Sequence, residues 1–566
     1  MRTLASILLL GAAVAATACA GSGASDSSYP TTGGASADAG AGGVSFGGAQ
    51  DFGDFKEILA NGGVPGPDTL DANGFFNEHY VPPPKTDCTN TLCLTPGLSV
   101  GRDWITGGHQ ATLQIAVNTN VDPANFPRKP LDLVVVVDRS GSMASDGRID
   151  KVRLGLTQMI DNLQDGDRMA VVSFSDATTV DAPLATLDRT ALHATVDALV
   201  PGGGTNIYDG LDKGFAVLAQ STAERQRRVI FLSDGQATVG DTNQDDIISL
   251  SDRYIETGIG LTTIGVGADF DLALMRGLAE HGAGNFYFLQ DTSSATEVFT
   301  EELDFFSSPI ALDIQIAATA GSGYQFGDVI GSTLWSSTTT TGSMHVPAVF
   351  VASRTSQTDP TGMDHRRGGG SMLFIHLDPT GHNDAAGTVA NVTITYKLPT
   401  GGDPVTQTVT LAYPNDPTVT PDDPYLSAPE MAKRYAMYNM FLGFRTATQQ
   451  GDINCASVAL YSTEAAAKTW NAPHEDSDII DDIALIETYL ANLRTVGATA
   501  TAETDPTTCA TLGDGLYPQD PPYGDQPGYG VDQPAYGCYD AGGGHASGLL
   551  AVALAGLVAV RRRRRE

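Results

Sequence analysis

Five side chains suited to binding a hard cation lie in three separate stretches of this 566-residue sequence. Asp138, Ser140 and Ser142 come directly after a long apolar run. Thr205 follows three consecutive glycines, and Asp234 follows a second apolar run. Carboxylate and hydroxyl oxygens favour Mg²⁺, Mn²⁺ or Ca²⁺ over Zn²⁺, and the three stretches contain no cysteine or histidine. They therefore predict a divalent metal site, for which we expect Mg²⁺, with Mn²⁺ or Ca²⁺ as alternatives.

Strand and helix patterns alternate around these residues, which predicts an open, doubly wound α/β (Rossmann-like) sheet over residues 131–306. In such sheets ligand sites form outside the C-terminal ends of the strands, so the three stretches can converge in space. The expected strands are 131–137, 168–174, 228–232, 261–266 and 285–288, and the expected helices are 149–163, 206–218, 245–256, 272–281 and 295–306.

In order and context, the five residues resemble the metal-ion-dependent adhesion site of von Willebrand factor A (VWA) and integrin I-type domains. In that family both serines and the threonine contact the metal directly, while the aspartates act directly or through water. The resemblance implies a complete metal site made by Asp138, Ser140, Ser142, Thr205 and Asp234. Because such a cation stays under-neutralised, it can accept a carboxylate from a protein partner.

A β-sandwich is predicted after Pro309, where helical patterns stop and strands alternate with Gly/Pro/Thr-rich turns. A half-buried strand at 111–117 precedes the α/β domain and needs a sheet to join, so we expect the α/β domain to be inserted in or flanked by the sandwich. A small helical region follows, in which Tyr435, Tyr438, Phe441 and Phe444 recur at a spacing of three and predict a packed core.

The predicted organisation resembles that of YfbK-like bacterial VWA proteins over most of residues 51–495. The expected parts are a signal peptide (1–18), a disordered linker (19–50), an N-terminal segment (51–100), the sandwich (101–130 plus 307–415), the VWA domain (131–306), the helical region (425–505), a Pro/Gly-rich linker (506–547) and a C-terminal transmembrane or sorting tail (548–566).

Both ends of the chain are typical of export signals. Arg2 precedes an apolar run and the sequence Ala16-Thr17-Ala18-Cys19. This pattern predicts a secretory signal peptide, cut either at an ordinary A-x-A site or at a lipobox that would leave Cys19 lipidated. At the other end, an apolar segment of about 20 Å as a helix precedes five arginines. It resembles the MYXO-CTERM sorting tails, and a plain tail anchor is the alternative.

Four cysteines remain outside these terminal signals, an even number in a chain expected to be exported. Local pairing is the simplest arrangement, and a four-cysteine zinc site is the alternative, although neither pair has C-x-x-C spacing. The predicted disulfides are Cys88–Cys93 and Cys455–Cys509.

The formal net charge of −34 repels phosphate backbones and argues against a nucleic acid partner. We expect a non-enzymatic protein of the cell envelope, at the outer membrane or cell surface of a Gram-negative bacterium. It would bind a protein partner through the metal, in adhesion or envelope assembly, with a membrane anchor at one or both termini. A metal-dependent hydrolase and an accessory subunit of an ATPase-linked assembly system are the alternatives.

Overall fold

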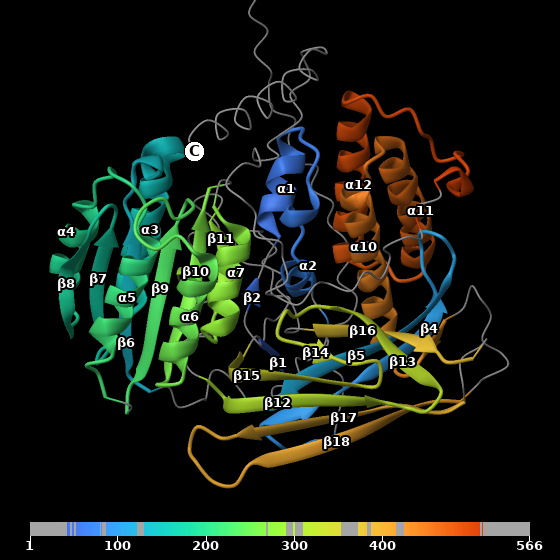
Figure 1. Cartoon of the computed structure of the whole chain (residues 1–566), viewed down its shortest axis with the longest axis horizontal. Coiled ribbons are helices and arrows are strands. Elements are labelled where there is room, and N and C mark those ends of the chain that lie inside the picture. The colour runs from blue at the N-terminus through green and yellow to red at the C-terminus, as the bar shows by residue number, and fades with distance from the viewer. Residues whose placement is uncertain are drawn as a thin grey trace, which may run out of the picture. The chain divides into compact units, whose positions relative to one another are not determined.

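The computed structural model (Figure 1) describes the greater part of the chain between Gly42 and Leu512. The signal peptide, Cys19 and the C-terminal tail lie outside the described residues. The described residues are 42–45, 48–49, 52–79, 81, 87–121, 129–222, 224–267, 270–289, 298–299, 309–351, 372–381, 386–414, 424–509 and 512.

The α/β domain is built on a sheet with strand order β2-β11-β10-β9-β6-β7-β8. All neighbouring strands are parallel except β8, which runs antiparallel to β7 at one edge. The strands are β2 (Gly48–Ala49), β6 (Leu131–Asp138), β7 (Arg168–Phe174), β8 (Thr178–Thr186), β9 (Gln226–Ser233), β10 (Ile259–Val266) and β11 (Asn285–Leu289).

Helices cover both faces of this sheet, and this explains the continuous apolar run of β6. Leu133 and Val135 belong to a core that also contains residues of α3 and α4, whereas Val134 and Val136 pack with α5, α6 and α7. A strand buried on both faces needs apolar residues at every position. The helices are α3 (Arg148–Asn162), α4 (Arg189–Asp197), α5 (Ile207–Leu218), α6 (Gln244–Ile255) and α7 (Leu272–His281).

The predicted fold class is confirmed, and the elements missed in this domain are the strands β2 and β8 and the helix α4. The residues of β8 are exposed or half-buried, because at the edge of the sheet the helices α4 and α5 cover it only in part. Its Thr- and Asp-containing sequence therefore lacks the apolar run by which the other strands were recognised. Most of the helix expected at 295–306 lies outside the described residues.

The β-sandwich has two layers that share one apolar core. Its strands form a continuous 12-stranded sheet, because β1 pairs with β5 in one layer and with β15 in the other. One layer contains β3 (Leu92–Leu94), β4 (Gly97–Arg102), β5 (His109–Thr119), β13 (Tyr324–Ile330), β16 (Met372–Pro379) and β19 (Tyr425–Leu426). The other contains β12 (Ala311–Ala320), β14 (Ser336–Ser337), β15 (Thr341–Val351), β17 (Gly387–Lys397) and β18 (Val405–Tyr413).

The α/β domain is an insertion in this sandwich, since the chain leaves it after β5 and returns at β12. Two domain boundaries near the N-terminus differ from those expected. The linker predicted at 19–50 contains β1 (Gly42–Ser45) and β2, and the N-terminal segment predicted at 51–100 contains β3 and most of β4. These stretches are too short for an apolar pattern to identify them, and backbone pairing with longer strands makes them strands.

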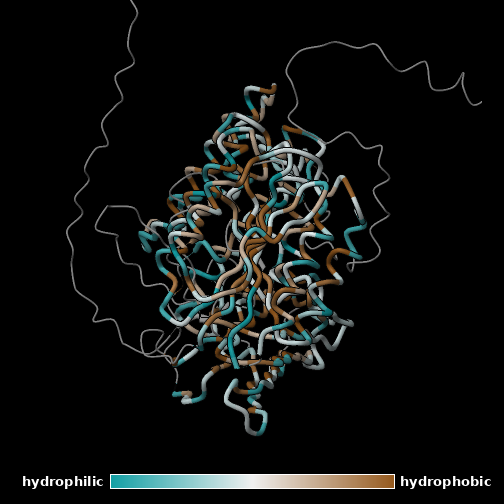
Figure 2. Tube along the Cα trace, turned by 90° about the vertical axis from the view of Figure 1, so that its left-hand side faces the viewer, coloured by the Kyte–Doolittle hydropathy of each residue, from teal (hydrophilic) through white to brown (hydrophobic). Residues whose placement is uncertain are grey.

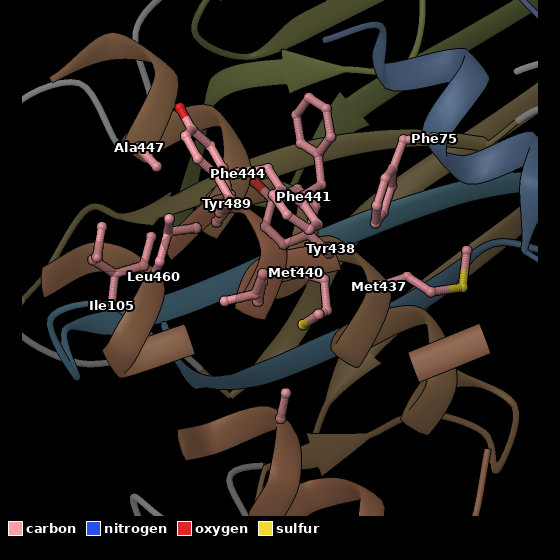
Figure 3. Packing of buried hydrophobic residues seen from close by; sticks show 14 of the residues in the cluster. Phe75, Ile105, Met437, Tyr438, Met440, Phe441, Phe444, Ala447, Leu460 and Tyr489 are labelled. Atoms are coloured by element: carbon pink, nitrogen blue, oxygen red, sulfur yellow. The ribbon is translucent and has the colours of Figure 1, made fainter. Parts of the chain in front are cut away.

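Helices from the two ends of the described chain pack on one another. The aromatic rings of Phe75, Phe441, Phe444 and Tyr489 meet in one core, as Figure 3 shows. The core packing predicted for the aromatic residues of α10 is therefore confirmed. The helices are α1 (Gly53–Ala60), α2 (Ala72–Glu78), α10 (Met431–Gln449), α11 (Ile453–Asn471) and α12 (Ser477–Thr495).

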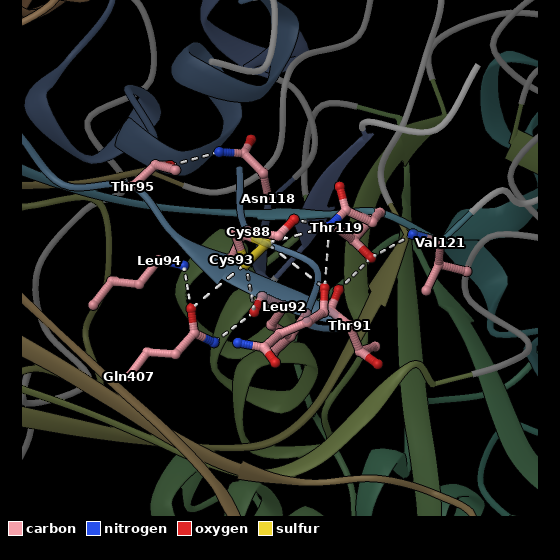
Figure 4. Close-up of a disulfide and its surroundings, with 12 residues drawn as sticks. Cys88, Thr91, Leu92, Cys93, Leu94, Thr95, Asn118, Thr119, Val121 and Gln407 are labelled. Carbon is pink, nitrogen blue, oxygen red and sulfur yellow. Dashed lines mark hydrogen bonds between the residues drawn. A yellow bond between two sulfur atoms is a disulfide. The ribbon is translucent and has the colours of Figure 1, made fainter. Parts of the chain in front are cut away.

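The structure contains the disulfides Cys88–Cys93 and Cys455–Cys509. Figure 4 shows the first, beside Leu92, whose backbone oxygen accepts a hydrogen bond of 2.6 Å from Gln407 Nε2 of β18. The second holds the turn at Pro506–Thr508 against α11. The Pro/Gly-rich linker predicted from residue 506 therefore begins with residues that belong to the fold.

Apolar residues gather in the interior and polar ones at the periphery, as Figure 2 shows. Among the described residues, none of the helices is both long and apolar enough to cross a membrane.

A buried charge cluster fixes the start of β6, at the opposite end of the strand from Asp138. Asp132 is fully buried and accepts hydrogen bonds from Arg168, Arg225 and Ser221. Burial alone would raise the pKa of Asp132, but these hydrogen bonds outweigh it and hold the pKa below its ordinary value of 3.8. The cluster thus joins β6, β7 and the segment before β9.

Asp132→Asn is expected to lower the free energy of unfolding at pH 7 by about 2 kcal/mol, because it leaves the partly buried guanidinium groups of Arg168 and Arg225 without their carboxylate. Since the folded pKa lies below the unfolded one, this contribution is complete above about pH 4 and is lost as the pH falls through the folded pKa. Urea unfolding at pH 7 and pH 3 measures both effects. Exposed Asp403→Asn is the control, and a difference from wild type that did not shrink at pH 3 would contradict the assignment.

The two disulfides should differ in their effect on stability, because they close loops of different length. The cysteines are separated by 5 positions in one pair and by 54 in the other. Loop-closure entropy predicts losses of about 2 and about 4 kcal/mol when each pair is replaced by serines. Equal losses in denaturant unfolding of the two double variants would show that loop entropy does not govern the difference.

Candidate metal centre

Asp138 ends β6, and both of its carboxylate oxygens are held by neighbouring loops. Ser140 N donates to Oδ1 at 2.7 Å, and Ser233 Oγ donates to Oδ2 at 2.7 Å. Burial raises the pKa of Asp138 to about 6, the hydrogen bonds from Ser233 and Ser140 oppose that rise, and the nearby charge of Asp234 adds to it. Ser140 and Ser233 therefore hold the Asp138 carboxylate in place, and neither of these residues carries a charge.

Two serine hydroxyl groups connect the loop after β6 to the loop after β9. Ser140 Oγ lies 3.0 Å from Ser142 Oγ, and Ser142 Oγ donates to Asp234 Oδ1 at 2.8 Å. Ser140 and Asp234 are buried, whereas Ser142 is exposed at the surface. These contacts bring four of the five predicted ligands into one cluster at the C-terminal ends of β6 and β9.

Backbone hydrogen bonds bring the glycine-rich loop (residues 202–204) against the loop after β6. Gly141 N donates to Gly203 O at 3.0 Å, and Gly202 N donates to Arg139 O at 2.7 Å. Thr205, two residues further on, is buried, and its own N–H donates to Thr238 Oγ1 at 2.9 Å. The structure thus places Thr205 in the loop that packs on the other four residues.

Gly203 adopts a left-handed conformation with φ of +90°. A Cβ atom there would lie 2.4 Å from Asp176 Oδ2. Asp176 in turn accepts a hydrogen bond of 3.0 Å from Gly204 N through its Oδ1. The glycines are therefore needed both for the backbone turn and for the close approach of this carboxylate.

Four supporting residues were not singled out in the sequence. Ser233 binds Asp138, Asp176 and Thr238 hold the glycine-rich loop, and Arg148 Nη1 donates to Asp234 Oδ2 at 2.8 Å. Ser233 lies next to a predicted ligand, and Arg148 is a cation at the start of a helix, which is an unfavourable position for its charge. Nothing in their local sequence marks Asp176 and Thr238, because their role depends on tertiary contact.

The donor set fits a hard divalent cation. Two buried carboxylates, Asp138 and Asp234, lie among the hydroxyl groups of Ser140 and Ser142, and all of these donors are oxygen atoms. Within the part of the chain that the structure describes, His, Cys, Asp and Glu form no cluster of three or more with metal-binding geometry. A metal here must therefore rely on hydroxyl ligands as well as carboxylates, which favours Mg²⁺-type over Zn²⁺-type coordination.

The protein-family model of the von Willebrand factor type A domain matches residues 132–301 of this sequence. This part of the chain is a VWA domain. VWA domains usually bind a divalent metal and mediate protein–protein interactions.

Two relatives show how far the similarity extends. YfbK of Escherichia coli is 27% identical over 187 residues, which cover 32% of this chain and 32% of that protein. The mouse inter-alpha-trypsin inhibitor heavy chain H2 is 26% identical over 206 residues, which cover 34% of this chain and 21% of that protein. The chain therefore matches about a third or less of the length of these relatives.

Among solved structures, a von Willebrand factor type A protein from Catenulispora acidiphila aligns with a TM-score of 0.47 at 16% identity, covering 77% of this chain and 99% of that one. The VWA2 paralog of ArnB from Sulfolobus acidocaldarius aligns with a TM-score of 0.40 at 15% identity, covering 73% and 100%.

Gly203→Ala is expected to destabilise the VWA domain by about 1 to 3 kcal/mol, since it adds a strained φ and a collision with Asp176. Thermal unfolding measures the loss. Gly451→Ala is the matched control, because a Cβ atom there has no neighbour within 4 Å. If Gly203→Ala unfolded at the same temperature as this control, the close packing of the glycine-rich loop would be refuted.

Proposed function

We propose that this protein is an exported cell-envelope protein that binds a protein partner through a divalent metal, Mg²⁺ by preference and Mn²⁺ or Ca²⁺ as alternatives. The observation that carries the proposal is the convergence of two buried carboxylates and neighbouring hydroxyl groups at one edge of the sheet. Asp138, Ser140, Ser142, Thr205 and Asp234 would hold the ion. Bound there, the metal supplies a positive charge that attracts a carboxylate of the partner.

Binding rather than catalysis is supported by the way the site carboxylates are used. Both oxygens of Asp138 and both of Asp234 accept hydrogen bonds from the protein's own serines, backbone and Arg148. This arrangement suits ligands that hold an ion in a fixed place. A hydrolase also needs a base aimed at a substrate pocket.

Export is supported by the two disulfides, because such bonds persist in oxidising compartments. In this proposal the signal peptide directs the chain to the outer membrane or cell surface of a Gram-negative bacterium. Lipidated Cys19, the C-terminal tail or both provide the membrane anchor, and the role at that location is adhesion or envelope assembly.

Asp138→Ala is expected to weaken Mg²⁺ binding by more than about tenfold and to abolish partner capture, because it removes a buried carboxylate ligand. Calorimetry with Mg²⁺ measures the first effect. Pull-down from envelope extracts in Mg²⁺ or in EDTA measures the second. Asp403→Asn, which changes the same charge on an exposed loop, is the control. A partner that still bound in EDTA would refute metal-dependent binding.

A further inference from the structure

Arg148 occupies a position that helix stability does not explain. It is the first residue of α3, where a positive charge opposes the helix dipole. Yet its side chain is only 7% exposed, and its Nη1 donates to Asp234 Oδ2 at 2.8 Å. The contact reaches across 86 positions of sequence, from the start of α3 to the loop after β9.

Two glycines with left-handed backbone conformations lie next to Arg148, one in the chain and one in space. Gly147, directly before Arg148, has a left-handed φ of +66°. Gly267, after β10, has a φ of +77°, and a Cβ atom there would lie 2.6 Å from Arg148 Nε. The glycine at 267 therefore leaves the space that the guanidinium occupies beside the metal centre.

The charges of the centre give this contact a functional consequence. The hydrogen-bond partners of Asp138 are neutral, and Arg148 is the cation that pairs with Asp234. Arg148 Nη2 also lies 3.8 Å from Asp146 Oδ2, but the side chain of Asp146 is 81% exposed, so water screens its charge. The buried groups alone, two carboxylates and one guanidinium, carry one net negative charge. A divalent ion would leave one net positive charge at the centre, whereas without the guanidinium the same centre would be neutral.

We propose that Arg148 sets the charge of the metal centre, so that the bound ion keeps a net positive charge and selects an anionic group of the partner. This inference rests on the proposed function. The guanidinium stays protonated throughout the ordinary pH range, so its effect is constant. It lowers the affinity for the ion itself and raises the affinity of the loaded centre for a carboxylate, because buried charges interact more strongly than charges in water.

Arg148→Gln tests the inference, with Mn²⁺ as the metal probe and acetate as the carboxylate probe. We expect the variant to bind Mn²⁺ at least about tenfold more tightly, and its Mn²⁺-loaded form to bind acetate at least about tenfold more weakly. Calorimetry measures the first affinity and water proton relaxation the second. Arg148→Lys keeps the charge and should stay within about threefold of wild type for both.

Exposed Arg253→Gln is the control for net charge and should change neither affinity. Arg148→Met is a second neutral variant with the same expected shifts, in case glutamine disturbs the fold, and circular dichroism checks both. Unchanged or weaker Mn²⁺ binding by a folded neutral variant would overturn the role of Arg148 while the proposed function stood. A wild-type protein that bound no Mn²⁺ would instead overturn the metal-dependent function on which the inference rests.

Discussion

Two like charges, those of Asp138 and Asp234, are buried close together at the C-terminal edge of a parallel sheet. Burial of carboxylates is unfavourable unless hydrogen bonds or cations compensate it. The surrounding structure provides both: serine hydroxyls and a backbone N–H for Asp138, and a serine and Arg148 for Asp234. The glycine-rich loop packs against the loop that carries Ser140 and Ser142, and the start of α3 supplies Arg148 to the loop after β9.

The rest of the sheet makes that arrangement rigid. At its other end, Asp132 joins neighbouring segments through Arg168 and Arg225. Between the two charged ends, every residue of β6 is buried, and alternate side chains pack into separate cores. A site that depends on hydrogen bonds of 2.7 to 3.0 Å needs such a support, because small displacements would break those contacts.

The scaffold outside the VWA domain connects sequence-distant parts of the chain. Arg228 of β9, which is fully buried and whose pKa burial lowers to about 9, lies over the ring of Phe350 in the sandwich. His79, at the end of α2, forms a buried hydrogen bond of 2.8 Å between its Nε2 and Asp482 Oδ2 of α12. Burial opposes a charge on His79, but Asp482 outweighs this and raises its pKa. Polar contacts as well as apolar cores therefore hold the inserted domain to the sandwich and the terminal helices to one another.

The sequence by itself determined the elements whose periodicity is strong. The continuous apolar run of β6 predicts a strand that is buried on both faces. The regular aromatic spacing in α10 predicts a helix that packs in a core. It also predicted the five candidate ligands, because their types, spacing and order resemble the metal-ion-dependent adhesion site of VWA domains. The edge strand β8 and the short strands β1 to β4 were missed in whole or in part, since pairing with a longer strand, rather than their own pattern, makes them strands.

Only the tertiary structure decided which charges meet. Arg148 and Asp234 are 86 positions apart, and no local pattern connects them. The same holds for Asp176, which supports the glycine-rich loop from another strand end. Residue types at strand ends can predict that a cation binds, because their side chains supply the oxygen ligands that the cation needs. The net charge that the cation retains depends on which side chains are buried beside it, and that is set by how the loops fold together.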